Sequence, residues 1–232
     1  MCETDDLHNF TGVYREYYDG DKTKIKSEVF MNNGKKEGPY KSYWDNGCEL
    51  SIDANLKSSN SKRENLSSTN SLGQLYEEVN YIDGKRNGIY KEYYSNGKLY
   101  EEVNYNDDKK NGIYKNYWYN MQLKEEVNYN DDKKNGIYKS YWDNGQLKEE
   151  VNYIDGKRNG IYKSYYENGQ LYKEVNYIDD ERNGIYKEYY KNGQLWVEIN
   201  YINSKMNGNY KKYYKNGQLK VEIKYIDDIA VS

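Results

Sequence analysis

The sequence predicts an all-β fold, an elongated single-layer antiparallel meander of tandem β-hairpin repeats that twists or curls. The first observation behind this prediction is a repeat of constant length. The glycine of an N-G-x-Y motif recurs every 24 residues, at Gly88, Gly112, Gly136, Gly160, Gly184 and Gly208. Such regularity indicates a repeat array. Gly12 and Gly38 open two earlier copies.

The second observation is that each copy reads as two short strands around an N-G turn. We expect Asn96 and Gly97 to form a type I′ turn, in which both central residues have positive φ. Residues opposite each other then share a face of the sheet. One face carries Tyr90, Tyr94, Leu99, Val103 and Tyr105, with Gly88 beneath the last ring. The other face carries Ile89, Lys91, Tyr93, Tyr100, Glu102 and Asn104.

This register places a constant basic residue opposite a constant glutamate in every copy. The structural charge ladder that it predicts consists of Lys91, Glu102, Lys115, Glu126, Lys139, Glu150, Lys163, Glu174, Lys187 and Glu198. Each exposed pair contributes only about 0.2 to 1 kcal/mol. Repeated along the sheet, the pairs oppose a one-residue slip, which would turn every tyrosine to the wrong face.

Composition favours a thin, aromatic core. Apolar residues make up 36% of the 232-residue chain, which contains 32 Tyr but only 2 Phe, and ordinary domains are about 45 to 50% apolar. Tyrosine provides a large apolar body with a polar tip, which suits a half-buried surface. No apolar stripe with helical periodicity provides a second layer. We therefore expect the sheet's own curvature, or a partner, to cover its aromatic face.

Charge and targeting signals exclude several classes of protein. The 35 basic and 38 acidic residues alternate within each repeat, so nucleic-acid binding is not expected. We expect a cytoplasmic or otherwise intracellular location, because there is neither a signal peptide nor an 18-residue apolar run. Cys2 and Cys48 are too few for a disulfide framework.

Irregular segments suggest how the chain is divided. We expect an N-terminal tail (1–10), N-terminal repeats (11–50), a main repeat array (73–226) and a C-terminal tail (227–232). Residues 51–72 lack tyrosine and are rich in Ser and Asn, so they form either a linker or a degenerate repeat. Met121 occupies a turn position where other copies have Gly.

The repeated line G-x-Y-x-x-Y-Y-x-N-G-x-L, followed by a tyrosine and a G-K-x-x-G turn, resembles the MORN repeat family in its variant form. The resemblance covers about residues 11–50 and 73–226. It implies hairpin repeats in an extended sheet, no catalysis within the repeats, and use as a scaffold. It also implies two alternatives: membrane or phosphoinositide association, and antitoxin-like neutralisation of a partner.

Catalytic, metal and cofactor sites are not expected. His8 is the only histidine. Nucleophilic sites that use a histidine base, and metal sites with histidine ligands, are therefore not expected. The D-D-K-K-N-G turns lack the ligand spacing of a calcium loop. The glutamate column is explained by pairing with lysine rather than by acid–base chemistry.

One tyrosine column has two interpretations. It consists of Tyr93, Tyr117, Tyr141, Tyr165, Tyr189 and Tyr213, and it shares a face with the charge ladder. These rings either pack on neighbouring strands and lysine stems or form a recognition stripe, because exposed tyrosine is favoured at interfaces. We expect a non-enzymatic scaffold that binds an unknown protein partner, or itself, through its aromatic face or its open sheet edges.

Overall fold

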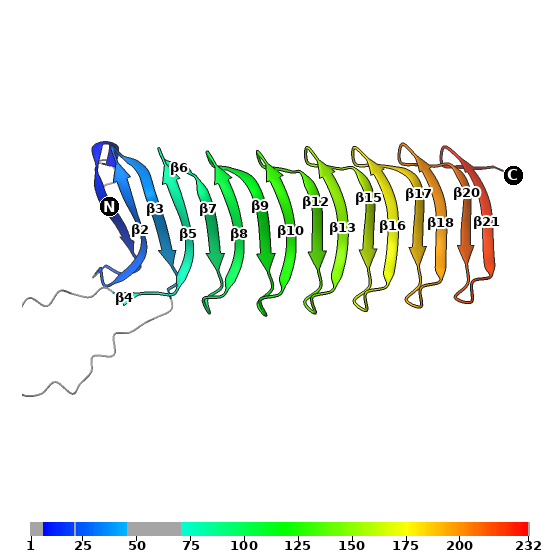
Figure 1. Ribbon diagram of the computed structural model, residues 1–232, viewed down its shortest axis with the longest axis horizontal. Helices are drawn as coiled ribbons and strands as arrows, with labels where there is room; N and C mark the ends of the chain where they lie inside the picture. The colour runs from blue at the N-terminus through cyan, green and yellow to red at the C-terminus, as the bar shows by residue number, and fades with distance from the viewer. Residues whose placement is uncertain (1–6, 21, 46–70, 232) are drawn as a thin grey trace, which may run out of the picture. The chain divides into compact units, whose positions relative to one another are not determined.

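The computed structural model describes residues 7–20, 22–45 and 71–231, and it confirms the all-β hairpin meander (Figure 1). The chain divides into two compact units, residues 1–100 with 105–108 and residues 101–104 with 109–232. Residues 51–70, most of the segment expected as a linker or a degenerate repeat, lie outside the described residues.

The first unit begins with a short 3-10 helix, η1, and continues as strands. Its elements are η1 (Leu7–Asn9), β1 (Gly12–Tyr17), β2 (Lys24–Asn32), β3 (Lys35–Tyr43), β4 (Ser71–Leu72), β5 (Leu75–Ile82), β6 (Lys85–Arg86) and β7 (Gly88–Tyr93). Strands β1, β2, β3 and β5 pair in chain order and antiparallel. The two-residue β4 pairs parallel to β2. Strand β8 (Leu99–Asn106) contributes residues to both units.

The second unit repeats one hairpin several times. Its strands are β9 (Lys109–Tyr117), β10 (Leu123–Asn130), β11 (Lys133–Lys134), β12 (Gly136–Tyr141), β13 (Leu147–Ile154), β14 (Lys157–Arg158), β15 (Gly160–Tyr165), β16 (Leu171–Ile178), β17 (Glu181–Tyr189), β18 (Leu195–Ile202), β19 (Lys205–Met206), β20 (Gly208–Tyr213), β21 (Leu219–Ile226) and β22 (Ile229–Val231). Consecutive strands pair antiparallel. Part of the segment expected as a C-terminal tail therefore pairs as β22 with β21.

The N-G turn differs from the predicted type I′ turn. In the β12–β13 hairpin, Gly145 N–H donates to Trp142 O (2.9 Å) and Trp142 N–H donates to Gln146 O (2.8 Å). Gly145 has φ of 82°, whereas Asn144 does not have positive φ. This is a three-residue loop, a type I turn closed by a glycine bulge. The side chain of Asn144 also accepts a hydrogen bond from Gln146 N–H (2.9 Å).

The bulge absorbs one residue, so the predicted register still holds in the strand bodies. Lys139 lies opposite Glu150, but Tyr141 next to the bulge lies opposite Leu147. The expected separation of Tyr94 and Tyr100 onto opposite faces is wrong for the same reason. Their rings pack together with centroids 5.1 Å apart.

The type I′ turns lie at the other end of the hairpins. Asp155 and Gly156 have φ of 50° and 84°, and Asp179 and Asp180 have φ of 50° and 71°. The side chain of Asp180 explains why a non-glycine residue occupies this position. Its Oδ1 accepts hydrogen bonds from the backbone N–H (3.0 Å) and Nε (2.7 Å) of Arg158 in the preceding hairpin. These contacts offset the cost of the left-handed conformation.

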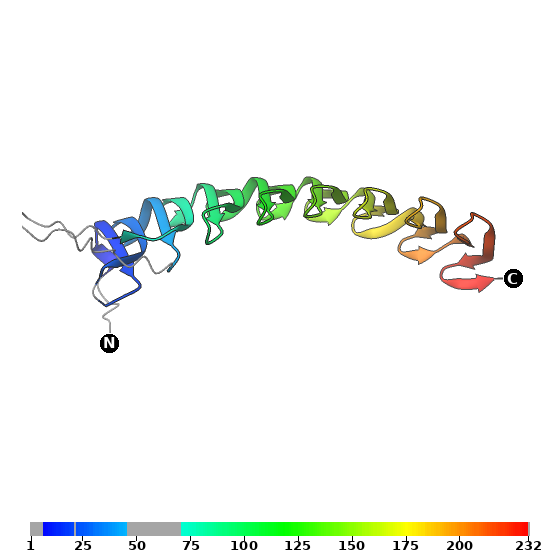
Figure 2. The same ribbon diagram turned by 90° about the horizontal axis from the view of Figure 1, so that it is seen from below.

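The two faces of the second unit differ sharply in burial. The valine face carries Val127, Val151 and Val175, and Val175 is only 1% exposed. The ladder face carries the Lys/Glu ladder together with isoleucines such as Ile161, which is 60% exposed. Figure 2 shows that the hairpins of this unit bend along their length. We infer that the valine face lies inside this bend.

Tyrosine rings cover the valines in place of a second layer. Tyr162 lies opposite Val175, and its ring packs edge-on against the Tyr177 ring with centroids 6.2 Å apart. The Arg158 guanidinium lies 4.0 Å from the centre of the Tyr177 ring, a cation–π contact that adds to this cover.

The tyrosine expected over Gly88 packs against another ring. A Cβ added at Gly88 would meet no heavy atom within 4 Å, whereas the ring of Tyr105 packs edge-on against that of Tyr90, with centroids 5.9 Å apart. Gly88 has φ of 91°. It lies where the pairing of β5 shifts from Arg86 to Lys91, so the glycine is required by the backbone.

Replacing Met121 by glycine should stabilise the protein. Met121 has φ of 71° at the bulge position, and its side chain is 42% exposed. We expect Met121→Gly to raise the free energy of unfolding by about 1 kcal/mol, because glycine adopts this conformation without steric strain. Urea denaturation measures the change.

Gly193 provides the matched control. It has φ of 83°, and an added Cβ would meet no heavy atom within 4 Å. Gly193→Ala should therefore cost about 1 kcal/mol through φ alone. A denaturation midpoint for Met121→Gly at or below that of the wild type would contradict the turn assignment.

Candidate interaction surface

The predicted tyrosine stripe lies on the ladder face and connects neighbouring hairpins. Tyr165 Oη donates to Oε1 of Glu150 in the preceding hairpin (3.1 Å). The same contact recurs from Tyr93 to Glu78, Tyr117 to Glu102, Tyr141 to Glu126, Tyr189 to Glu174 and Tyr213 to Glu198, at 2.7 to 3.2 Å. These rings are half-buried. These rings therefore pack against neighbouring strands, as the first interpretation of this column expected. The recognition stripe stays a prediction.

Burial and the accepting carboxylates change the acidity of these hydroxyls. Loss of solvent, together with the hydrogen bond to glutamate, raises the pKa of Tyr141, Tyr165 and Tyr189 to about 12. The pKa values of Tyr117 and Tyr213 are raised for the same reasons. A negative charge on these hydroxyls would be buried beside another negative charge.

The charge ladder runs across hairpins as well as within them. Glu150 lies opposite Lys139 in its own hairpin and opposite Lys163 in the next one. The ion pair Lys187–Glu174 has an N···O separation of 3.7 Å, and Lys211–Glu198 one of 3.9 Å. The tyrosine hydroxyls lie closer to these glutamates than the ammonium groups do. The ladder glutamates thus form ion pairs with lysine and also accept hydrogen bonds from tyrosine.

A second Tyr–Glu column, on the valine face, was not recognised in the sequence. Tyr138 Oη donates to Glu125 (3.0 Å), and Tyr162 Oη donates to Glu149 (2.7 Å). Each acceptor directly precedes a ladder glutamate. The Glu-Glu pair of one hairpin therefore accepts one tyrosine hydroxyl of the next hairpin on each face of the sheet. The repeated E-E dipeptide was the available sequence signal.

Exposed isoleucines form a row on the ladder face. Ile113, Ile137, Ile161 and Ile185 are 58 to 61% exposed. Ile161 lies opposite Asn176, and a hollow of about 380 Å³ lies between Ile161 and Ile185, with Asn176, Asn183 and Lys187 in its lining. The exposed isoleucines thus stand on either side of an amide-lined hollow.

The described residues contain no cluster of three or more His, Cys, Asp or Glu side chains placed to hold a metal ion. His8 lies in η1, and its neighbour Asn9 is exposed. None of the helical segments described is long and apolar enough to cross a membrane. The surface is built from repeated packing and hydrogen-bonding groups.

The raised tyrosine pKa values predict a loss of stability at alkaline pH. Below pH 10 these hydroxyls are protonated in both folded and unfolded chains, so their contribution is complete there. It is lost as the pH rises from about 10 to about 12, because only the unfolded chain ionises readily. We expect the urea midpoint to fall over this range.

A variant combining Tyr141→Phe, Tyr165→Phe and Tyr189→Phe tests the cause. It removes three of the hydroxyls that titrate, so its midpoint should fall less steeply between pH 10 and pH 12. An alkaline slope equal to that of the wild type would show that other groups cause the loss.

Comparison with known families identifies the repeat. Five stretches match the family model described as MORN repeat variant: residues 86–107, 134–155, 158–179, 182–203 and 206–227. Each stretch contains the two principal strands of one hairpin, such as β15 and β16 in residues 158–179. A search of curated proteins found no match to the chain.

Proposed function

Because this chain is a MORN-repeat protein of the variant type, we propose that it is a non-enzymatic scaffold that binds a protein partner along its ladder face. MORN repeats generally act as scaffolds or in membrane association and generally lack catalysis. The observation that carries the proposal is the row of exposed isoleucines at Ile113, Ile137, Ile161 and Ile185. Single exposed apolar residues are ordinary, whereas contiguous apolar surface marks interaction sites.

The isoleucine row extends into a wider apolar band. Ile178 is 48% exposed and follows Asn176 by two residues on the same strand, so it lies diagonally across from Ile161. The band is bordered by the alternating charges of the ladder, as at Lys163 and Glu174. An apolar centre with a polar rim is the usual anatomy of a protein–protein interface.

Rigidity favours binding by such a surface. The Tyr–Glu contacts on both faces hold each hairpin against the next, so little side-chain or backbone freedom remains to be lost when a partner binds. A partner would meet the same side chains at every hairpin, and several weak contacts on one rigid surface add to each other.

The test replaces the row with a residue that the chain itself uses at this position. Asn209 stands in the last hairpin where Ile185 stands in the previous one. The combined variant Ile137→Asn, Ile161→Asn and Ile185→Asn should therefore fold. We expect the tagged wild-type chain to capture a near-stoichiometric protein from lysate of its own cells, as measured by quantitative mass spectrometry, and the variant to lose it.

A matched control changes the neighbouring isoleucines instead. Asn106 and Asn130 occupy the position of Ile154, Ile178 and Ile202 in other hairpins. The variant with these three isoleucines changed to Asn, at the edge of the apolar band, should weaken capture much less than the row variant does. Capture that is equal for both variants, or no captured protein, would contradict binding through the row.

A further inference from the structure

A row of aromatic side chains lines the N-G turns of the second unit, outside the ladder face. It consists of Trp118, Trp142, Tyr166, Tyr190 and Tyr214. Four of these rings are fixed by a hydrogen bond to a backbone carbonyl of the next hairpin. The donor–acceptor pairs are Trp118 to Tyr141, Trp142 to Tyr165, Tyr166 to Tyr189 and Tyr190 to Tyr213, at 2.8 to 3.3 Å.

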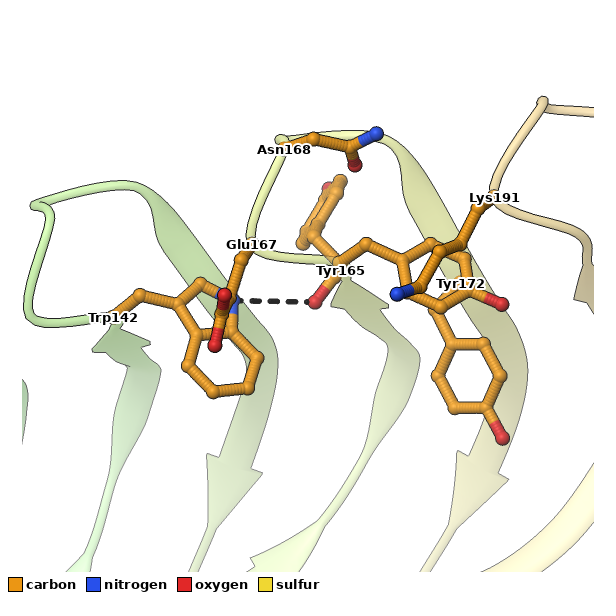
Figure 3. A pocket seen from close by; sticks show the side chains of 7 residues that line it. Trp142, Tyr165, Glu167, Asn168, Tyr172 and Lys191 are labelled. Carbon is orange, nitrogen blue, oxygen red and sulfur yellow. Dashed lines mark hydrogen bonds between the residues drawn. The ribbon is translucent and has the colours of Figure 1, made fainter.

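One position in this row opens into a pocket of about 520 Å³. Side chains from three successive hairpins line it: Trp142, Tyr165, Tyr166, Glu167, Asn168, Tyr172 and Lys191. Figure 3 labels all of these except Tyr166. Tyr172 adds a second aromatic ring to this turn, whereas Lys124, Lys148 and Lys220 occupy the equivalent position in other hairpins. The rings of Tyr166 and Tyr172 lie 5.0 Å apart.

The charges in and around the pocket disfavour ionic ligands. Lys148 Nζ already lies 4.7 Å from the centre of the Trp142 ring, and Lys191 Nζ lies 5.7 Å from that of Tyr166. The chain's own ammonium groups therefore occupy positions where a ligand cation would bind. Glu167 lines the same pocket and would repel an anion.

The hydrogen-bonding groups distinguish between neutral ligands. An extended proline-rich peptide has unpaired backbone carbonyls that require donors. Trp142 Nε1 and Tyr166 Oη already donate to the protein's own backbone. The other polar groups of the lining include a carboxylate, an ammonium and a hydroxyl at Glu167, Lys191 and Tyr172. The Asn168 amide also lines the pocket, and its Oδ1 accepts a hydrogen bond from Gln170 N–H (3.2 Å). This mixed set suits hydroxyl groups, which both donate and accept hydrogen bonds.

We propose that this pocket binds a neutral oligosaccharide. A pyranose ring has an apolar face that stacks on the fixed aromatic walls, and its hydroxyls reach Glu167, Asn168 and Lys191. The pocket falls within the size range of small-molecule sites, about 300 to 1,000 Å³. The next turn repeats the aromatic pair, with Tyr190 and Trp196 rings 5.9 Å apart. The oligosaccharide therefore continues along the row onto the next hairpin.

Isothermal titration calorimetry of the full chain with cellohexaose, maltohexaose and N-acetylchitohexaose tests this inference. We expect one of these sugars to bind, and Trp142→Ala and Tyr172→Lys each to weaken that binding about tenfold, a loss of about 1.4 kcal/mol. Tyr172→Lys should fold, because the chain uses lysine at this position in other hairpins.

Two ring-preserving variants separate binding from a structural role. Tyr172→Phe and Trp142→Phe keep an aromatic wall, and Trp142→Phe also removes the hydrogen bond to Tyr165 O. Both should retain affinity to within about threefold. The inference is overturned if none of the sugars binds, if binding survives both Trp142→Ala and Tyr172→Lys, or if decaproline binds the pocket and the sugars do not.

Discussion

The constraint on which the structure of each unit depends is that its described strands form one layer, with no packed second layer to bury the core. Each hairpin must obtain its burial from the hairpins beside it. Valines such as Val175 reach 1% exposure because the sheet bends and because tyrosine rings of the same face lie over them. A single hairpin could not do this, which is the physical reason for a repeated sequence.

Backbone pairing joins consecutive hairpins, and a few side-chain polar contacts with fixed partners strengthen each junction. The dipeptide Glu149–Glu150 places one carboxylate on each face, and each accepts a tyrosine hydroxyl from the next hairpin. Hydrogen bonds to a charged acceptor are stronger than neutral ones, about 1.5 to 3 kcal/mol each. Where Lys173 replaces the first glutamate, its Nζ instead lies 5.1 Å from the centre of the Tyr162 ring.

The repeat period and the residue types of the strands predicted the fold, but local geometry and long-range contacts were less accessible. The N-G signal fits both a type I′ turn and a type I turn with a bulge, and only φ at Asn144 separates them. The true type I′ turns contain aspartates that bond to the preceding hairpin, as Asp180 does. The pocket at Trp142 and Tyr172 requires side chains from three hairpins, which no single repeat displays.

The most direct test of this account is a double-mutant cycle between Glu150 and Tyr165, using Glu150→Gln and Tyr165→Phe with urea denaturation. The account predicts a coupling energy of about 1 kcal/mol between these two residues of adjacent hairpins. The pair Glu150 and Tyr189, which lies two hairpins apart, should be additive. Additivity for Glu150 and Tyr165 would show that this contact does not help to hold adjacent hairpins together and would contradict the account.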